Sequence, residues 1–341
     1  MTYNQLMSTV YTFVPSPGHH FPDHPEGPER LELLPLEQIS GIEQIPVTPA
    51  TVSEVSRVHH PRLIEQLEAV CPQGPGIIDY APTYVTPTSF SDALNAAGAA
   101  LSVVRAILDG TARNGFALAR PPGHHAEPGR AMGFCLFNNA AIAAQEALAH
   151  GLKRVAVIDF DVHHGNGTQA AFLRDPRAGY LSTHQEGIYP GTGWLEEADS
   201  ADKRGRIINI PLPARTGDEG FRQILEQVMK PFVRHFAPEL LIVSAGYDAH
   251  WRDPLASLGL STAGFEMLSR GLVEIAEESC QGRIVFLLEG GYDPQNVAHG
   301  IEAGFTALTG HPPKEVDDAS PHREPEIDDR LERTRKWHGL K

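Results

Sequence analysis

The sequence predicts an α/β protein in which helices cover both faces of a mostly parallel central sheet, giving three layers. Short apolar runs alternate with longer helical patterns along the chain, which is the signature of βαβ units. Most of these runs are apolar almost throughout, as expected for strands that are buried on both faces. No repeat of fixed period and no low-complexity linker divides the chain. We therefore expect one domain over residues 1–310, followed by a polar tail over residues 311–341.

The expected strands are the apolar runs 115–123, 154–162, 178–184, 206–213, 239–248 and 283–293. The segments with helical spacing are 91–110, 138–151, 220–236 and 263–279. Ser91 and Asp92 at the start of the first helix and Gly151 after the second are typical start and stop signals. The tail is rich in proline and charge, which predicts an extended arm with one short helix. Packing of this tail on a second subunit, as an oligomerisation arm, is the alternative.

The composition narrows the classes of partner. The chain has 341 residues and a formal net charge of −15, which disfavours nucleic-acid binding through a basic face. An acidic surface favours cationic partners such as lysine-bearing peptides or polyamines, although the charge could equally serve solubility alone.

Other features bear on the compartment. Three cysteines in no paired or C-x-x-C pattern argue against a disulfide framework. The first residues lack the pattern of a secretory signal, and no apolar run approaches the roughly 20 residues that cross a bilayer. These observations favour a cytoplasmic protein that does not enter a membrane.

Polar side chains collect at the carboxyl ends of the predicted strands, where parallel α/β sheets bind ligands. In VIDFDVHHGNG, alternate side chains point the same way, so Asp159, Asp161 and His163 share one face. Asp248 follows another strand in SAGYDAH. Two aspartates and one histidine form a divalent-metal site with an open position for water, the mark of a catalytic site. The alternative is a polar turn formed by chance, with aspartates that only cap helices.

Two further groups stand at the same edge. His124 and His125, in the loop RPPGHHAEPG, can supply a base for a metal-bound water. Tyr292 follows two glycines in LLEGGYD, and its phenol can donate to an oxyanion formed by attack on a carbonyl. Without these neighbours, a core or surface tyrosine would be the default interpretation. The doublets His19-His20 and His59-His60 are interpreted as loop histidines.

With these residues in place, the chain resembles the arginase–deacetylase superfamily, and specifically its histone deacetylase-like amidohydrolases of the class II type. The matching segments occur in the family's order, from near residue 20 to about residue 310. They are HPEGPER (24–30), RPPGHHAEPGRAMGFCLFNNAA (120–141), DFDVHHGNGTQ (159–169), PGTG (190–193), SAGYDAHWRDPL (244–255) and EGGYD (289–293). The resemblance implies the arginase–deacetylase fold and a single catalytic domain.

The resemblance also implies roles for the site residues. One catalytic zinc ion (Zn2+) would be held by Asp161, His163 and Asp248. His125 would be the general base and later the acid, with His124 as its electrostatic neighbour.

Two residues would orient this histidine pair, Asp159 for His124 and Asn166 for His125. A carboxylate favours the imidazolium form and an amide adds no charge, so His125 is expected to be the neutral base. Tyr292 would polarise the acyl carbonyl together with zinc.

A structural potassium ion (K+) is implied as well. Asp159 and Ser182 would supply side-chain oxygens, and Asp161 and His163 would supply backbone carbonyls. Arg30 is expected to line an inner channel.

The family's narrow acyl tunnel maps here onto Gly133, Phe134, Tyr189 and Leu255. Tyr189 stands where phenylalanine is usual, and its hydroxyl would change the polarity of the tunnel. Leu255 stands where polyamine-selective relatives place an acidic gatekeeper, which argues mildly against polyamines because no carboxylate meets a buried ammonium there. Glu186, in the loop before Tyr189, is a candidate substitute.

The expected function is a zinc-dependent amidohydrolase that removes acetyl or related short acyl groups from lysine side chains or lysine-like amines. An acetylpolyamine deacetylase is the nearest alternative, and other small amides stay open as substrates. A catalytically idle acyl-amine binding protein is a rival of another class. A ureohydrolase of the arginase type is disfavoured, since a two-metal cluster would need more carboxylate ligands than these strand ends supply. A homo-oligomer is an open expectation.

Overall fold

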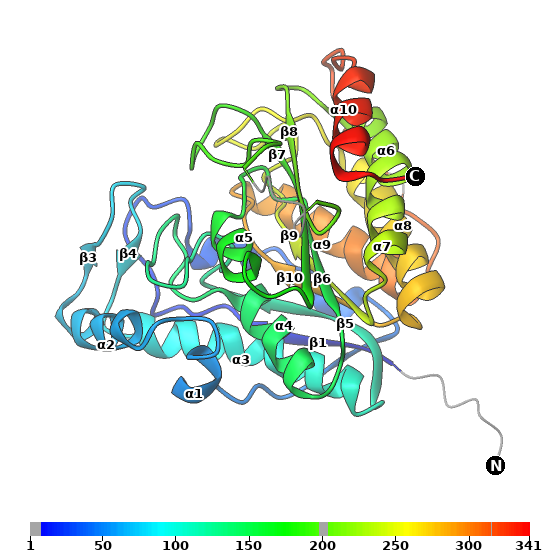
Figure 1. Ribbon diagram of the computed structural model, residues 1–341. Coiled ribbons are helices and arrows are strands. Elements are labelled where there is room, and N and C mark those ends of the chain that lie inside the picture. Colours follow the sequence, from blue (N-terminus) through cyan, green and yellow to red (C-terminus); the bar gives the residue numbers. More distant parts are fainter. Residues whose placement is uncertain (1–7, 198–203, 315) are drawn as a thin grey trace.

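A computed structural model describes residues 8–197, 204–314 and 316–341 of the chain (Figure 1). Within these ranges, eight strands form one sheet in the order β2-β1-β5-β10-β9-β6-β7-β8, and all neighbours pair in parallel. The strands are β1 (Ser8–Val14), β2 (Ile42–Gln44), β5 (Ala112–Ala119), β6 (Val155–Asp159), β7 (Ala178–Gln185), β8 (Ile207–Leu212), β9 (Leu240–Ala245) and β10 (Ile284–Leu288). A separate antiparallel hairpin joins β3 (Gly76–Ile77) to β4 (Tyr84–Val85).

The predicted strands all enter the sheet, but four of them end earlier than expected. β5, β6, β9 and β10 stop three to five residues before the predicted ends, and the residues that follow form loops at the carboxyl edge. These loops carry the polar residues of the candidate site. β1 is missing from the predicted strands because threonines interrupt its apolar pattern. Thr9 and Thr12 are buried there, and their hydroxyls donate to the carbonyls of Leu308 and Ala99.

Helices cover both faces of the sheet and give the three predicted layers (Figure 1). α3 (Ser89–Leu108) and α4 (Asn139–Ala149) pack on one face through buried alanines. The opposite face is covered by α6 (Asp218–Ile224), α7 (Lys230–Phe236), α8 (Thr262–Cys280) and α9 (Pro294–Thr309). α6 and α7 are joined by a π-helical turn, Leu225–Met229, within the segment predicted as one helix. The remaining helices are α1 (Val52–Val55), α2 (Pro61–Val70), α5 (Asn166–Phe172) and α10 (Asp328–His338).

α3 differs from the prediction in two ways. It begins at Ser89, after the N-cap Thr88, and not at the predicted Ser91. In the described part of the chain it is also the one helix long and apolar enough, by length and composition, to cross a membrane. The expectation that no segment would reach this limit is therefore wrong. Core helices pass the same test, however, and 56% of the apolar window in α3 is buried inside the fold.

The C-terminal tail packs against its own domain instead of extending away from it. α10 is the predicted short helix, and it lies beside β8 and α6 (Figure 1). Leu331 on this helix is fully buried in the main core, together with Ile327 just before it. A role of the tail in oligomerisation stays a prediction.

Candidate functional site

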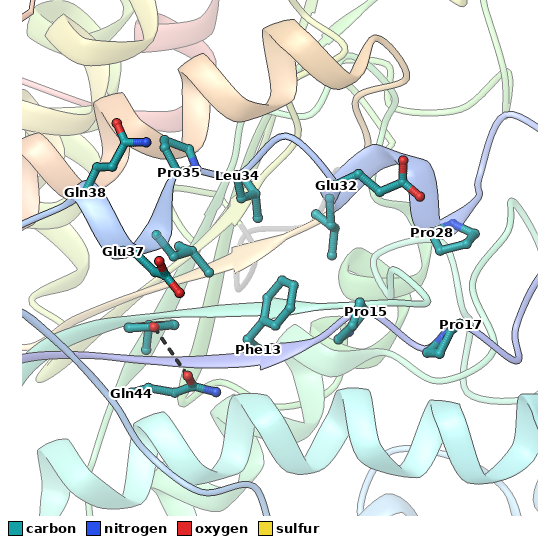
Figure 2. A pocket seen from close by; sticks show the side chains of 13 residues that line it. Phe13, Pro15, Pro17, Pro28, Glu32, Leu34, Pro35, Glu37, Gln38 and Gln44 are labelled. Carbon is teal, nitrogen blue, oxygen red and sulfur yellow. Dashed lines mark hydrogen bonds between the residues drawn. The ribbon is translucent and has the colours of Figure 1, made fainter.

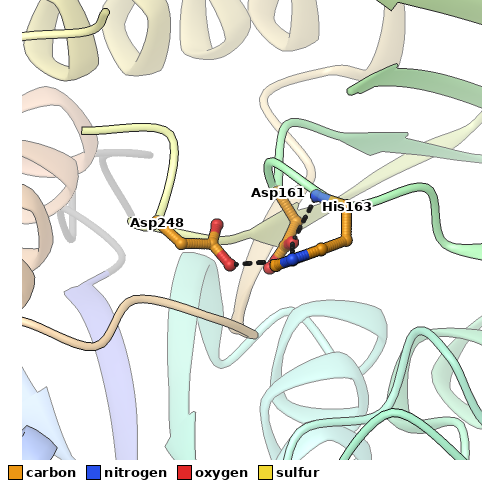
Figure 3. Close-up of side chains that lie close together, drawn as sticks. All are labelled: Asp161, His163 and Asp248. Carbon is orange, nitrogen blue, oxygen red and sulfur yellow. Dashed lines mark hydrogen bonds and ion pairs between the residues drawn. The ribbon is translucent and has the colours of Figure 1, made fainter. Parts of the chain in front are cut away.

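Asp161, His163 and Asp248 come together at the carboxyl edge of the sheet (Figure 3). Nδ1 of His163 lies 3.2 Å from Oδ1 of Asp161 and 3.2 Å from Oδ2 of Asp248. One candidate ligand atom from each residue lies within 4.8 Å of the others. Both aspartates are fully buried. Asp161 and His163 lie in the loop after β6, and Asp248 lies in the loop after β9. Two segments that are far apart in the sequence therefore build the site.

Backbone amides hold the two aspartates in place. The amide of Gly290 donates to Oδ2 of Asp161 at 2.8 Å, and the amide of Val162 donates to Oδ1 of Asp248 at 3.0 Å. A Cβ atom at Gly290 would lie 2.1 Å from Oδ2 of Asp248, and one at Gly246 would lie 2.1 Å from Oδ2 of Asp161. Only glycine therefore lets the two carboxylates approach each other here.

This donor set fits a single divalent cation. Two buried carboxylates at one point are unfavourable without positive charge, because burial strengthens their mutual repulsion. Two carboxylate oxygens and one imidazole nitrogen are ligands that zinc accepts, and three protein ligands leave a position open. Asp161, His163 and Asp248 would thus hold the metal.

The neighbouring histidines have contrasting partners. Nδ1 of His124 lies 3.1 Å from Oδ2 of Asp159, and Nδ1 of His125 lies 2.8 Å from Oδ1 of Asn166. Burial alone would lower the pKa of His124, but the charges of Asp161 and Asp159 outweigh it and raise that pKa well above its usual value. Burial, followed by the charge of His124, holds the pKa of His125 well below its usual value. His124 is therefore charged and His125 neutral at pH 7.

Tyr292 lies between an aromatic ring and a cation. Its ring centroid is 5.8 Å from that of Phe134, in an edge-on arrangement, and 5.0 Å from the guanidinium carbon of Arg30. The Arg30 side chain is buried and donates to the backbone carbonyls of Gly291 and Glu289. Burial raises the pKa of Tyr292 well above its usual value, so its hydroxyl stays protonated and available as a donor.

The four predicted tunnel residues lie at different distances from the histidine pair. A Cβ atom at Gly133 would lie 2.4 Å from the ring of His125, so glycine lets this loop pass close to the base. The Phe134 ring contacts that of Tyr292, and the ring centroids of Tyr189 and His125 lie 5.0 Å apart. Leu255 is 40% exposed, so it lies at the surface.

Two other expectations from the sequence concern the structural potassium site and Glu186. Asp159 and Ser182 are paired in register on β6 and β7, but Ser182 Oγ lies 2.8 Å from Nδ1 of His184. The structural potassium site stays a prediction. Glu186 is ion-paired, with Oε2 lying 3.0 Å from Nη1 of Arg330, and its role as a substitute gatekeeper stays a prediction.

The interpretation of the other doublets as loop histidines is incomplete. His19 is buried and stacks on Tyr84 with ring centroids 4.3 Å apart. His59 is also buried, and its ring nitrogens contact the carbonyl of Glu127 and the amide of Asn138. Both histidines belong to the structural framework around the site.

Sequence reasoning missed two buried carboxyls beside the site. Glu289 accepts hydrogen bonds from the amides of Gly123 and His124 and from the hydroxyl of Ser244. Burial raises the pKa of Glu289 to about 7. Asp253 accepts from the amide of Tyr292, and burial raises its pKa to about 7. Glu289 directly follows β10, and that position is the signal that could have identified it. Asp253 lies in the loop beyond β9, after Asp248, and no comparable signal marks it.

A separate cavity of about 630 Å³ is lined by a different set of residues (Figure 2). It runs along β1 and the segment that follows Pro28, and its walls include Phe13, Leu34 and several prolines. It contains none of the predicted site residues. The cavity therefore adds nothing to the chemistry at the carboxyl edge.

The chain is similar to proteins of one family. The model of the histone deacetylase domain matches residues 24–308. Histone deacetylase 14, chloroplastic, from Arabidopsis thaliana is 47% identical over 235 residues, covering 67% of this chain and 56% of that protein. A probable deacetylase from Archaeoglobus fulgidus is 41% identical over 270 residues, covering 79% of this chain and 73% of that protein. A histone deacetylase-like amidohydrolase from Pseudomonas aeruginosa is 40% identical over 240 residues, covering 69% of this chain and 62% of that protein.

A solved structure supports the same likeness. The HD domain of HDA15 matches with a TM-score of 0.82 and 33% identity, covering 89% of this chain and 91% of that one. The predicted fold class is thereby confirmed. The chain spans little more than half the length of the chloroplastic relatives, 56% for the Arabidopsis protein and 54% for a rice histone deacetylase 10.

Proposed function

The chain belongs to the histone deacetylase domain family, and from this premise we propose that it is a zinc-dependent amidohydrolase of acylated amines. Family membership supports a hydrolytic deacetylase. The finer proposal is that it removes acetyl or related short acyl groups from lysine side chains or lysine-like substrates.

One observation supports this proposal: three side chains that could hold a metal ion lie at one edge of the sheet, together with a histidine of lowered pKa and a tyrosine of raised pKa. When bound, zinc would supply Lewis acidity and a nucleophile at neutral pH. The remaining chemistry belongs to the side chains of the protein.

His125 is suited to be the proton acceptor. Its Nδ1 faces the amide oxygen of Asn166, which can only accept, so Nδ1 carries the hydrogen and Nε2 keeps its lone pair. The low pKa of His125 keeps that lone pair available at pH 7. Nε2 can take a proton from the attacking water and return it to the leaving amine.

Tyr292 is suited to stabilise the oxyanion. Its hydroxyl is protonated, and Phe134 and Arg30 fix the ring from two sides. A preorganised donor of this kind strengthens its hydrogen bond as the acyl oxygen gains charge. The same contacts leave the hydroxyl free to meet a substrate carbonyl.

Acyl-lysine is favoured over acylpolyamine by two side chains. Leu255 offers no charge, and Glu186 already has an ion-pair partner in Arg330. A polyamine would bring a second ammonium group that needs a carboxylate if it is buried. We also propose a cytoplasmic location and a family-type potassium site, both of which rest on the sequence.

Kinetics with purified enzyme would test the proposal. We expect zinc-dependent turnover of an acetyl-lysine peptide, with a higher kcat/KM than for N-acetylputrescine or acetylated spermidine. Metal content and loss of activity with a chelator would be measured on the same preparation. Preference for the acetylated polyamines would replace the lysine assignment, and absence of turnover from zinc-loaded enzyme on every acylated amine would overturn the hydrolase proposal.

A further inference from the structure

The C-terminal tail is attached to the loop that follows Asp248. Asp318 is 4% exposed, and its carboxylate accepts from Thr262 Oγ1 at 2.5 Å and lies 3.1 Å from Nε2 of His250. The backbone carbonyl of Asp318 accepts from the indole of Trp251 at 2.6 Å. A buried segment of the tail is thus fixed to residues just beyond a candidate metal ligand.

A second contact anchors the tail to α6. The Glu324 carboxylate accepts from the backbone amides of Gly217, Glu219 and Gly220 at 2.9, 3.0 and 2.9 Å. Amides at the start of a helix lack partners within the helix, so a carboxylate there satisfies several at once. This anchor brings α10 to a defined position beside β8.

Arg330 on α10 then reaches the loop that carries Tyr189. Its Nη1 lies 3.0 Å from Oε2 of Glu186 and also donates to the carbonyl of Pro211 on β8. The amide of Glu186 donates to the carbonyl of Leu212 at 2.9 Å. Arg330 therefore ties the first residue after β7 to the neighbouring strand.

The far end of this loop is held from inside the domain. Nδ1 of His164 lies 2.8 Å from Oγ1 of Thr192, and Nε2 of His184 lies 2.9 Å from the carbonyl of Gly193. The buried Tyr189 hydroxyl, in contrast, has no hydrogen-bond partner. Edge-on ring contacts with His125, His163 and Tyr80 are what the side chain itself makes. The backbone that places this ring is held at the two ends of its loop.

We propose that Arg330 is a positioning residue for substrate binding, which holds Glu186 and thereby keeps the Tyr189 ring on the wall of the acyl tunnel. The inference rests on the proposed function, because it takes Tyr189 as a wall of that tunnel. Arg330 lies outside residues 24–308, the part of the chain matched by the family model. The tail therefore contributes to the Tyr189 loop a contact that the matched domain does not contain.

Steady-state kinetics on the full chain would test this role. Arg330→Met should raise KM for an acetyl-lysine peptide roughly fivefold, the effect of losing about 1 kcal/mol, with kcat changed less than twofold. Arg330→Lys should restore most of the affinity because it keeps the charge near Glu186. The matched control is Arg333→Met on the same helix, whose ion pair with Glu196 is more than half exposed on both sides; its KM should equal that of the wild type.

Hydrogen exchange gives a readout that does not need turnover. Amides of residues 186–189 and 191–193 should exchange faster in Arg330→Met than in Arg333→Met, while the unfolding midpoint and exchange in β6 and β9 stay unchanged. Glu186→Gln should reproduce the effect if Arg330→Met fails to fold. The inference would be overturned if Arg330→Met left both KM and the exchange rates unchanged. It would also be overturned if the variant lowered kcat about fivefold and left KM unaltered. A wild-type enzyme inactive on the peptide would contradict the proposed function, and the exchange comparison would still decide the role of Arg330.

Discussion

Oδ1 of Asn166 lies 2.8 Å from Nδ1 of His125, while the adjacent His124 faces a carboxylate instead of an amide. Two neighbouring imidazoles with ring centroids 4.0 Å apart therefore differ in charge. The amide orients His125 without adding a negative charge, which would favour the protonated form of the ring.

Replacing this amide by a carboxylate should impair the base. In Asn166→Asp the new charge favours the imidazolium form and raises the pKa of His125. Because the neutral form is the active one, the acid limb of the kcat/KM profile should move to higher pH by about one unit or more. Profiles from pH 5 to pH 9 would show this. Asn166→Ala should slow the reaction without moving the limb upward, and a superposition of the Asn166→Asp and wild-type profiles would contradict the assignment.

Removing the Tyr292 hydroxyl should reduce turnover and leave the fold intact. We expect Tyr292→Phe to lower kcat about a hundredfold or more, the usual effect of losing one oxyanion donor. The ring contacts with Phe134 and Arg30 remain, so the unfolding midpoint should not change. Tyr11→Phe is the control, since the Tyr11 hydroxyl donates only to Gln44 on β2 at an exposed position. Turnover by Tyr292→Phe at the wild-type rate would remove Tyr292 from the mechanism.

Metal binding should stabilise the protein through the three ligands. Zinc at a hundred times its dissociation constant would add about 2.7 kcal/mol to the free energy of unfolding. We expect a matching rise in the unfolding midpoint of chelator-treated protein, and loss of most of that rise in Asp248→Asn. Asp109→Asn, at an exposed position, should respond like the wild type. An equal response of both variants would place the metal elsewhere.

The buried ion pair between Glu26 and Arg120 should make stability depend on pH. The carboxylate of Glu26 accepts from Nε and Nη2 of Arg120 at 2.6 and 2.8 Å, and both side chains are fully buried. Burial would raise the pKa of Glu26, but Arg120 lowers it from 4.5 to about 2. Because the folded pKa is the lower one, the stabilisation is complete above about pH 4.5 and is lost as the pH falls towards 2.

Glu26→Gln should therefore cost about 3–5 kcal/mol of unfolding free energy at pH 7, since it leaves Arg120 buried without its partner. Urea unfolding at pH 7 and at pH 3 to 4 would measure the cost, which should shrink in acid. Glu219→Gln, which breaks an exposed pair with Arg222, should produce no measurable change at either pH. A cost for Glu26→Gln that is the same at both pH values would show that the pair is not the cause.

The parts of the site that follow from local pattern could be predicted. Buried parallel strands read as apolar runs, and their carboxyl ends share one edge, so Asp161, His163 and Asp248 could be grouped without coordinates. The burial of Glu26 and the partners of Glu289 could not be predicted. Arg120 lies 94 residues from Glu26, and Ser244 lies 45 residues from Glu289. No local periodicity records such a pairing.

The tail shows a second limit. Its composition is that of a solvated arm, with many charges and prolines, yet Asp318 and Glu324 are each satisfied by several donors from the domain. A charged residue in the sequence looks the same whether water or backbone amides surround it. Only the fold distinguishes the two.

The order of strands has a consequence for synthesis of the chain. Among the strands of the described part of the chain, β10 comes last in the sequence, yet it lies between β5 and β9 in the centre of the sheet. A nascent chain that ends before residue 284 has two unpaired strand edges in its middle, and it lacks Tyr292. Such edges invite pairing with other chains. The ribosome must therefore release nearly the whole domain before the sheet can close, and chaperones that shield strand edges should matter most during that interval.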